Sequence, residues 1–128
     1  MPYEISFTKK IAVEKTDIYF NECCWGGDSV RDVLLPLIAG KYEDVETNQE
    51  DWGWFIWFRK GGERLGIDIC CDDPSTGEFR IRLSSRTRKF LWFYRDDVDT
   101  PELETIRVIV CAKIQEWAGG CKVEQIER

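Results

Sequence analysis

The residues from 52 to 60 alternate as a β-strand does, yet both of the resulting faces are apolar. Even positions share one face and odd positions the other, because successive side chains of a strand point to opposite sides: Trp52, Trp54, Ile56 and Phe58, against Phe55 and Trp57. A hydrophobic core accounts for one apolar face. The second must be covered by another part of the protein, or it binds something.

A Gly61-Gly62 pair follows this strand, and two glycines between β-runs predict a tight hairpin. The turn sets the register and gives one face four apolar pairs: Trp52 with Cys71, Trp54 with Ile69, Ile56 with Ile67, and Phe58 with Leu65. We expect this to be the core face. On the other face Trp57 lies opposite Gly66, so its indole can rest over bare backbone.

Strand-like alternation recurs elsewhere along the chain. It predicts strands over residues 3–13, 63–72 and 78–84, and shorter ones over Ile18 to Phe20 and Cys121 to Ile126. The run from Phe90 to Tyr94 is a strand or a covering loop. Residues 41–51 are acidic and are expected to be irregular.

Two segments have helical spacing instead. The first has Asp28 or Ser29 as its N-cap and is closed by Gly40, with Pro36 predicting a kink or an early end. Its apolar positions are Val30, Val33, Leu34, Leu37 and Ile38. The second has Thr100 as N-cap, Pro101 at its first position and Gly119-Gly120 at its end. Its stripe is Leu103, Ile106, Val110, Ile114 and Trp117.

These elements predict an α+β fold: an antiparallel sheet of four to six strands, with two amphipathic helices packed on one face. The 128 residues suit one domain over 1–128, and neither a linker nor an internal repeat interrupts them. No apolar run approaches the roughly 20 residues of a membrane span, and the first residues do not resemble a signal peptide. We therefore expect a cytoplasmic protein with no membrane partner.

The net charge of −6 disfavours nucleic-acid binding, which depends on neutralising phosphates, and suits a basic protein partner. Charge is unevenly distributed: residues 43–51 and 96–104 are acidic, and residues 80–89 are basic. Either these segments pair with one another across the fold, or the basic segment is a cationic patch that faces a ligand.

The six cysteines are interpreted mainly as small buried apolar residues. Neighbouring cysteines on a strand point to opposite faces and cannot pair with each other. The chain has no histidine and no CxxC spacing, so no zinc site is predicted. Asp68 and Asp72 lie two pleats apart, so no other metal or cofactor is expected either. Cys70 is the best candidate nucleophile, although simple packing explains it as well.

The candidate binding residues are Phe55, Trp57, Asp68, Arg80 and Arg82, which the hairpin registers place on the face opposite the core. Grouped aromatic and arginine side chains are typical of recognition surfaces. The structural alternative is that the first strand, residues 85–95 or a second copy of the chain covers the aromatics, while Asp68 pairs with an arginine.

The pattern favours a non-enzymatic protein-binding domain, because no catalytic constellation is recognisable. An immunity- or inhibitor-type protein that neutralises a basic partner fits the size and acidity. Two alternatives stay open. One is a homo-oligomeric structural protein that self-associates through the Phe55 and Trp57 face. The other is a small anion-binding domain that uses Arg80 and Arg82.

Overall fold

The computed structural model describes residues 3–13, 16–90, 93–96 and 100–126, with side chains described outside residues 87–96. In chain order the elements are β1 (Tyr3–Thr8), the 3-10 helix η1 (Glu22–Cys24), α1 (Gly27–Ile38), β2 (Glu43–Glu50), β3 (Gly53–Lys60), β4 (Glu63–Asp73), β5 (Glu78–Phe90), β6 (Phe93–Asp96), α2 (Pro101–Ala118) and β7 (Lys122–Gln125). Within this described part, no helix is both long and apolar enough to cross a bilayer.

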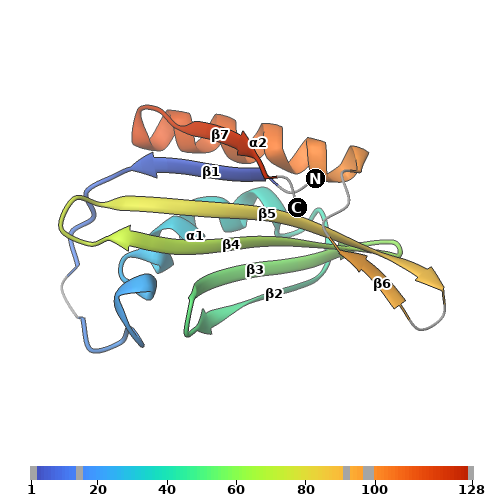
Figure 1. Ribbon diagram of the computed structural model, residues 1–128, viewed down its shortest axis with the longest axis horizontal. Helices are drawn as coiled ribbons and strands as arrows, with labels where there is room; N and C mark the ends of the chain where they lie inside the picture. The colour runs from blue at the N-terminus through green and yellow to red at the C-terminus, as the bar shows by residue number, and fades with distance from the viewer. Residues whose placement is uncertain (1–2, 14–15, 91–92, 97–99, 127–128) are drawn as a thin grey trace.

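The strands form one antiparallel sheet with the order β2-β3-β4-β5-β1-β7, and β6 pairs with the far end of β5 (Figure 1). The predicted α+β fold is confirmed, with β6 added to a path of six strands. The hairpin register is confirmed as well, since Trp54 pairs with Ile69, Ile56 with Ile67 and Phe58 with Leu65.

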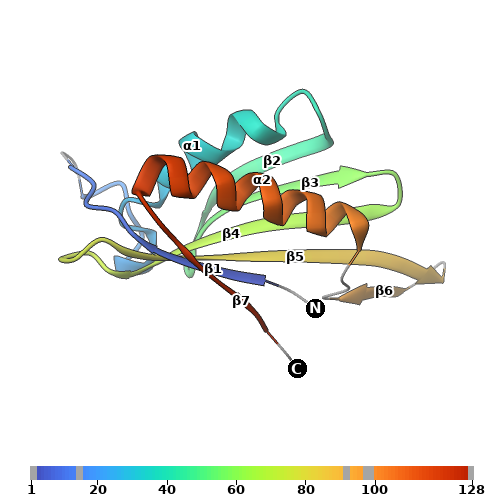
Figure 2. The same cartoon turned by 90° about the horizontal axis from the view of Figure 1, so that it is seen from above.

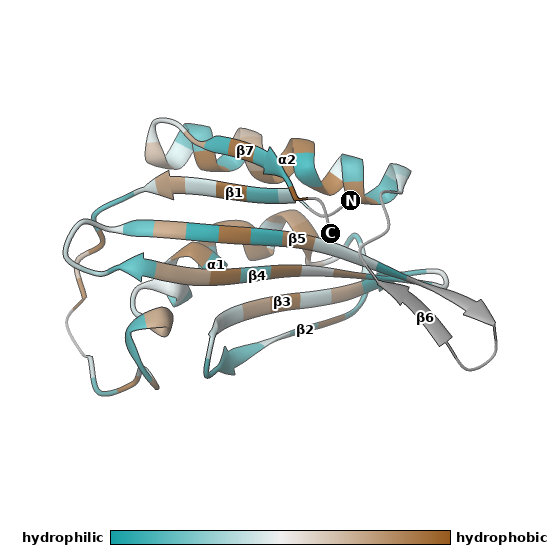
Figure 3. Cartoon of the chain, viewed as in Figure 1, coloured by the Kyte–Doolittle hydropathy of each residue, from teal (hydrophilic) through white to brown (hydrophobic). Residues whose placement is uncertain are grey.

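Both helices lie on the same side of the sheet (Figure 2). The core forms between them and the facing strands, and its fully buried side chains include Ile56, Ile67, Ile81, Leu34 and Ile106. Hydrophobic and hydrophilic residues alternate along β5, as Figure 3 shows by colour. This alternation sends Phe79, Ile81 and Leu83 into the core and the arginines between them to the other side.

The second helix begins and ends where the sequence predicts. The Thr100 hydroxyl accepts a hydrogen bond from the Leu103 backbone N–H at 3.1 Å, and Gly119 ends the helix in a left-handed conformation. The predicted apolar stripe is buried, except that Trp117 is half-buried.

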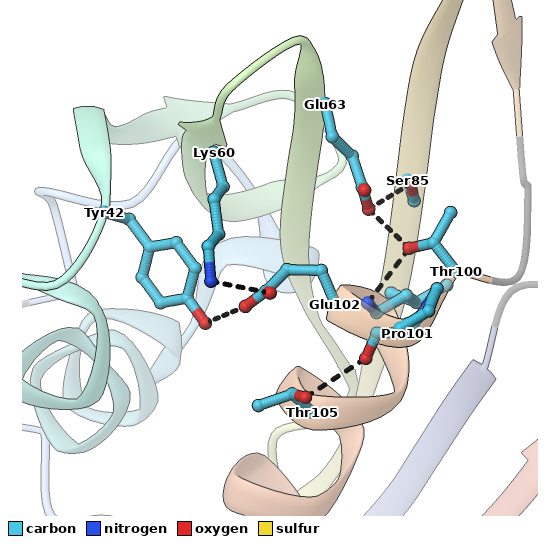
Figure 4. Close-up of polar contacts among 9 residues, drawn as sticks. Tyr42, Lys60, Glu63, Ser85, Thr100, Pro101, Glu102 and Thr105 are labelled. Atoms are coloured by element: carbon cyan, nitrogen blue, oxygen red, sulfur yellow. Dashed lines mark hydrogen bonds and ion pairs between the residues drawn. The ribbon is translucent and has the colours of Figure 1, made fainter.

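A polar network fastens the start of α2 to the sheet (Figure 4). The Glu63 carboxylate accepts hydrogen bonds from the hydroxyls of Ser85 and Thr100. On the same helical turn, Glu102 accepts a hydrogen bond from the Tyr42 hydroxyl at 2.6 Å and forms an ion pair with Lys60 at 3.0 Å. Because the capping threonine is itself held by a strand residue, this end of α2 has a defined position over the hairpin.

The first helix differs from its prediction at its start and closes at Gly40 as predicted. It begins at Gly27, with Gly26 rather than Asp28 or Ser29 at the N-cap. A side chain at Gly27 would collide with Trp54, since an added Cβ would lie 2.4 Å from Trp54 Cδ1. Pro36 lies inside the helix, which continues to Ile38.

Three strand predictions were wrong. Residues 43–50 are not irregular; they form the edge strand β2, whose register shifts near Asp44, a residue with φ of 52°. Ile18 to Phe20 is not a strand but part of a loop that Gln49 holds through hydrogen bonds to the Ile18 carbonyl and the Phe20 N–H. The first strand ends at Thr8 instead of Val13. Of the run from Phe90 to Tyr94, residues 91–92 lie outside the described part.

Trp52 does not pair with Cys71, and the prediction that it faces the core was wrong. β3 begins only at Gly53, so Trp52 belongs to the turn after β2. Gly53 has a φ of 144°, a conformation that L side chains rarely adopt, and this breaks the strand alternation between the two tryptophans. Trp54 therefore enters the core while Trp52 stays exposed.

The interpretation of most cysteines as buried was also wrong. Cys24 and Cys71 are buried, and Cys23, Cys70, Cys111 and Cys121 are half-buried. As predicted, the adjacent residues Cys70 and Cys71 lie on opposite faces of β4, and Cys71 belongs to the core.

Candidate functional site

The side of the sheet opposite the helices, called here the open face, carries all five predicted binding residues. β4 lies between β3 and β5, and its Asp68 pairs across the sheet with Phe55 on one side and with Arg82 on the other. Trp57 follows Phe55 on the same face, and Arg80 lies opposite Cys70. The predicted neighbourhood of Asp68 and the β5 arginines is thus confirmed, with Arg82 as the direct partner in register.

Three aromatic side chains form a row along one edge of the open face. The rings of Phe55 and Trp57 stack with centroids 3.9 Å apart, and the Trp52 ring lies 6.4 Å from Phe55. Phe55 is only 3% exposed, whereas Trp52 is 41% and Trp57 40% exposed. The two indoles therefore flank a buried phenyl ring and present the apolar surface of the row to the outside.

The indole of Trp57 rests on Gly66, as the hairpin register predicted. A Cβ added to Gly66 would lie 3.3 Å from Trp57 Cδ1 and 2.9 Å from Ser84 Oγ, so this close approach depends on glycine. The indole Nε1–H donates a hydrogen bond of 3.0 Å to Asp68 Oδ1. Gly66 beneath the Trp57 indole and the Asp68 carboxylate beside it hold the exposed ring in one orientation.

Asp68 has a pKa raised above the ordinary aspartate value, and burial is the main cause. The hydrogen bond from Trp57 and the positive charges of Arg82 and Arg86 act in the opposite direction without cancelling the effect of burial. Asp68 is therefore a partly desolvated carboxylate that positions the Trp57 ring through a hydrogen bond.

The two predicted arginines differ in their engagement. Arg80 forms ion pairs with Glu4 at 3.3 Å and with Asp72 at 3.1 Å. The acids come from β1 and β4, so these two ion pairs do not join Arg80 to the acidic segments 43–51 and 96–104 that were predicted to pair with it. Arg82 is exposed beside Asp68 and offers a guanidinium to the open face.

Two hollows lie on either side of Asp68. One, of about 450 Å³, is lined by Trp57, Gly66, Asp68, Ser84 and Arg86, together with residues of β2. The other, of about 380 Å³, is lined by Trp52, Asp68, Cys70, Arg82 and neighbouring residues. Asp68 belongs to both, so the open face is shaped around the carboxylate that orients Trp57.

Sequence reasoning missed three residues of this surface. Trp52 was assigned to the core, and Glu4 and Cys23, which also line the second hollow, were not connected with it. Glu4 reaches the open face because β1 pairs with β5, opposite Arg82 in register. No local pattern carries that signal, because the pairing joins distant parts of the chain.

The described side chains bear on two kinds of chemistry, metal binding and nucleophilic attack. In residues 3–13, 16–86 and 100–126 no three acidic or cysteine side chains gather as a metal site would require. Burial raises the pKa of the Cys70 thiol to about 11 and that of the Cys71 thiol to about 12. At neutral pH, little of either thiol is therefore present as the nucleophilic thiolate. No family model, curated protein or solved structure matches the chain.

Proposed function

We propose that the chain is a non-enzymatic protein-binding domain that docks its open face onto a partner protein. The stacked Phe55 and Trp57 pair supports this most directly, because it leaves an oriented, 40% exposed indole on a sheet face away from both helices. Tryptophan and arginine are the side chains most enriched among energetically dominant interface residues. Arg82 lies one strand beyond Asp68 on the same face.

The charge of the molecule favours a basic partner. Beside the aromatic row runs the edge strand β2, where Glu46 lies opposite Trp57 and Glu50 opposite Gly53. Together with the net charge of −6, this acidic edge attracts a cationic protein and accelerates its encounter. An immunity- or inhibitor-type protein that neutralises a basic partner combines these properties. Because all six cysteines are free thiols, the reducing cytoplasm suits the protein.

The test is the affinity of the purified partner, once identified by crosslinking and mass spectrometry, for three variants. Trp57→Ala removes the exposed indole and should weaken binding by a factor of about 30 or more, the usual effect at a dominant interface residue. The double variant Glu46→Lys and Glu50→Lys reverses the charge of the β2 edge and should mainly slow association. Val108→Ala is the matched control, since Val108 is a 51% exposed apolar residue on α2.

Far-UV circular dichroism confirms that each variant is folded before titration. Unchanged affinity in both the Trp57 variant and the β2 variant would reject the proposal. Light scattering of the free chain at micromolar concentration addresses self-association: a dimer that Trp57→Ala dissociates would assign the open face to a second copy instead. A thermal-shift screen with phosphate and carboxylates tests the anion-binding alternative, which the ion pairs of Arg80 with Glu4 and Asp72 already disfavour.

A further inference from the structure

Two thiols from distant parts of the chain meet at the rim of the open face. Cys23 belongs to the 3-10 helix η1, and Cys70 belongs to β4. The helix η1 packs against β4, and both cysteines line the same hollow as Trp52 and Arg80. Both residues are half-buried, so the pair is packed and yet within reach of a small reagent.

The neighbouring cysteines are positioned differently. The Cys24 thiol points into the core and donates a hydrogen bond of 3.0 Å to the Glu50 carbonyl, while Cys71 lies on the core side of β4. Burial raises the pKa of the Cys111 thiol of α2, and Cys121, which precedes β7, adds to the effect. This second pair belongs to the helix side of the molecule and serves as an internal comparison.

We propose that Cys23 and Cys70 are a redox modification site, which a low-molecular-weight disulfide converts into a reversible disulfide bond. The thiolate of one cysteine attacks a sulfur of the small disulfide, which forms a mixed disulfide and releases one small thiol. The second cysteine then attacks the protein sulfur of the mixed disulfide, forms the Cys23–Cys70 bond and releases the other small thiol. Two protein thiols are oxidised, the small disulfide is reduced by two electrons, and the two protons leave with the released thiols.

The shared hollow favours the second step, because the step is intramolecular and both cysteines lie where η1 packs against β4. Attack by the Cys70 thiol is slow at neutral pH. Burial raises the pKa of Cys70, Cys23 adds to the effect, and Arg80 opposes it. Attack by Cys70 therefore becomes faster as the pH rises toward the pKa of its thiol.

The bond would join η1 to β4 beside Trp52, which starts the aromatic row. It would also close the long loop between residues 23 and 70, which contains α1, β2 and β3, and would restrict the unfolded chain. Oxidation would thus stiffen one wall of the second hollow while it raises the melting temperature. This inference does not depend on what the open face binds.

The experiment incubates the purified reduced protein with glutathione disulfide, blocks remaining thiols by alkylation and measures intact mass and non-reducing peptide maps. The expected product has lost two hydrogen atoms per bridge, contains a peptide linking Cys23 to Cys70, melts at a higher temperature and returns to the starting mass with dithiothreitol. Cys23→Ser and Cys70→Ser should each abolish this peptide. The double variant Cys111→Ser and Cys121→Ser should retain it as the sole bridge.

Persistent glutathione adducts at Cys23 or Cys70, or a map in which only Cys111 and Cys121 are linked, would overturn the proposal. So would a Cys23–Cys70 yield no higher than that of mixed, non-specific pairs. Cys23→Ser alone suffices if Cys70→Ser does not fold, because Cys23 lies in a short surface helix and is half-buried.

Discussion

Replacing Gly53 by alanine should destabilise the protein strongly. This glycine has an unusual backbone angle and also lies very close to the backbone of β4. Its φ is 144°, and an added Cβ would lie 1.9 Å from the Ile69 carbonyl oxygen. That oxygen belongs to the strand residue paired with Trp54. The variant must therefore rotate the backbone that separates Trp52 from Trp54, or push β4 away from the start of β3.

The magnitude follows from two contributions. Strain at a backbone angle of this kind costs about 1–3 kcal/mol. Displacement of packed neighbouring atoms costs about 1–3 kcal/mol more. We expect a loss of about 4 kcal/mol, a large part of the 5–15 kcal/mol stability that is typical of a domain. Gly40 provides the control: its φ is 83°, and an added Cβ would meet no heavy atom within 4 Å. Gly40→Ala should cost only about 1–2 kcal/mol.

The assay is equilibrium unfolding in urea, followed by far-UV circular dichroism so that tryptophan movements do not distort the signal. The difference between the two variants, about 2 kcal/mol by the values above, isolates the contact with Ile69. If Gly53→Ala is as stable as Gly40→Ala to within about 0.5 kcal/mol, the carbonyl contact does not explain the glycine, and the reasoning fails.

Three further variants test other parts of the structure by the same unfolding assay. Asp68→Asn should be more stable than the wild type at pH 7. Because the pKa of Asp68 is raised in the folded protein, the unfolded chain releases this proton first as the pH rises, and ionisation then disfavours the folded state. The gain in stability should vanish below the ordinary aspartate pKa of about 3.9. An Asp68→Asn variant that is less stable than the wild type at pH 7 would contradict the predicted direction. Thr100→Ala should lower the free energy of unfolding by about 1–2 kcal/mol, because it removes the N-cap of α2 and a hydrogen-bond donor to Glu63. The control Thr105→Ala, an exposed change on the same helix, should change it by no more than about 0.5 kcal/mol. Equal losses in the two variants would show that the cap does not stabilise the protein. Leu34→Ala, at a fully buried position, should cost about 2–5 kcal/mol, and a loss below about 1 kcal/mol would mean that α1 does not support the core.

The β3–β4 hairpin could be predicted because its determinants are local. Gly61-Gly62 sets the turn, and the apolar alternation on both sides then leaves one register that buries Ile56 and Ile67 together. The same register placed Trp57 over Gly66 and Phe55 opposite Asp68, and the next hairpin placed Asp68 near Arg80 or Arg82. The central residues of the open face could therefore be predicted from the sequence.

The strand β2 could not be predicted, because half of its eight residues are acidic and acidic residues have a low intrinsic preference for strands. It forms because β3 offers an unpaired edge, and Val45 and Thr47 become half-buried there. The position of Trp52 was missed for a related reason. The alternation rule assumes ordinary backbone angles, and the angle at Gly53 breaks it within one residue. The meeting of Cys23 with Cys70 depends on how η1 packs against β4, which no short-range pattern encodes.

The place of β1 in the sheet has a consequence for how the chain folds. The four strands from β2 to β5 follow one another as hairpins, so each pairs with a neighbour that is close in sequence. β1 instead pairs with β5 on one side and with β7 on the other, where Ile5 lies opposite Val123. Contacts of such long sequence separation form slowly, because the intervening chain must be ordered first. The strand β1 is thus among the last to find both of its neighbours. Until then the β5 edge that it covers is available to the strands of other chains.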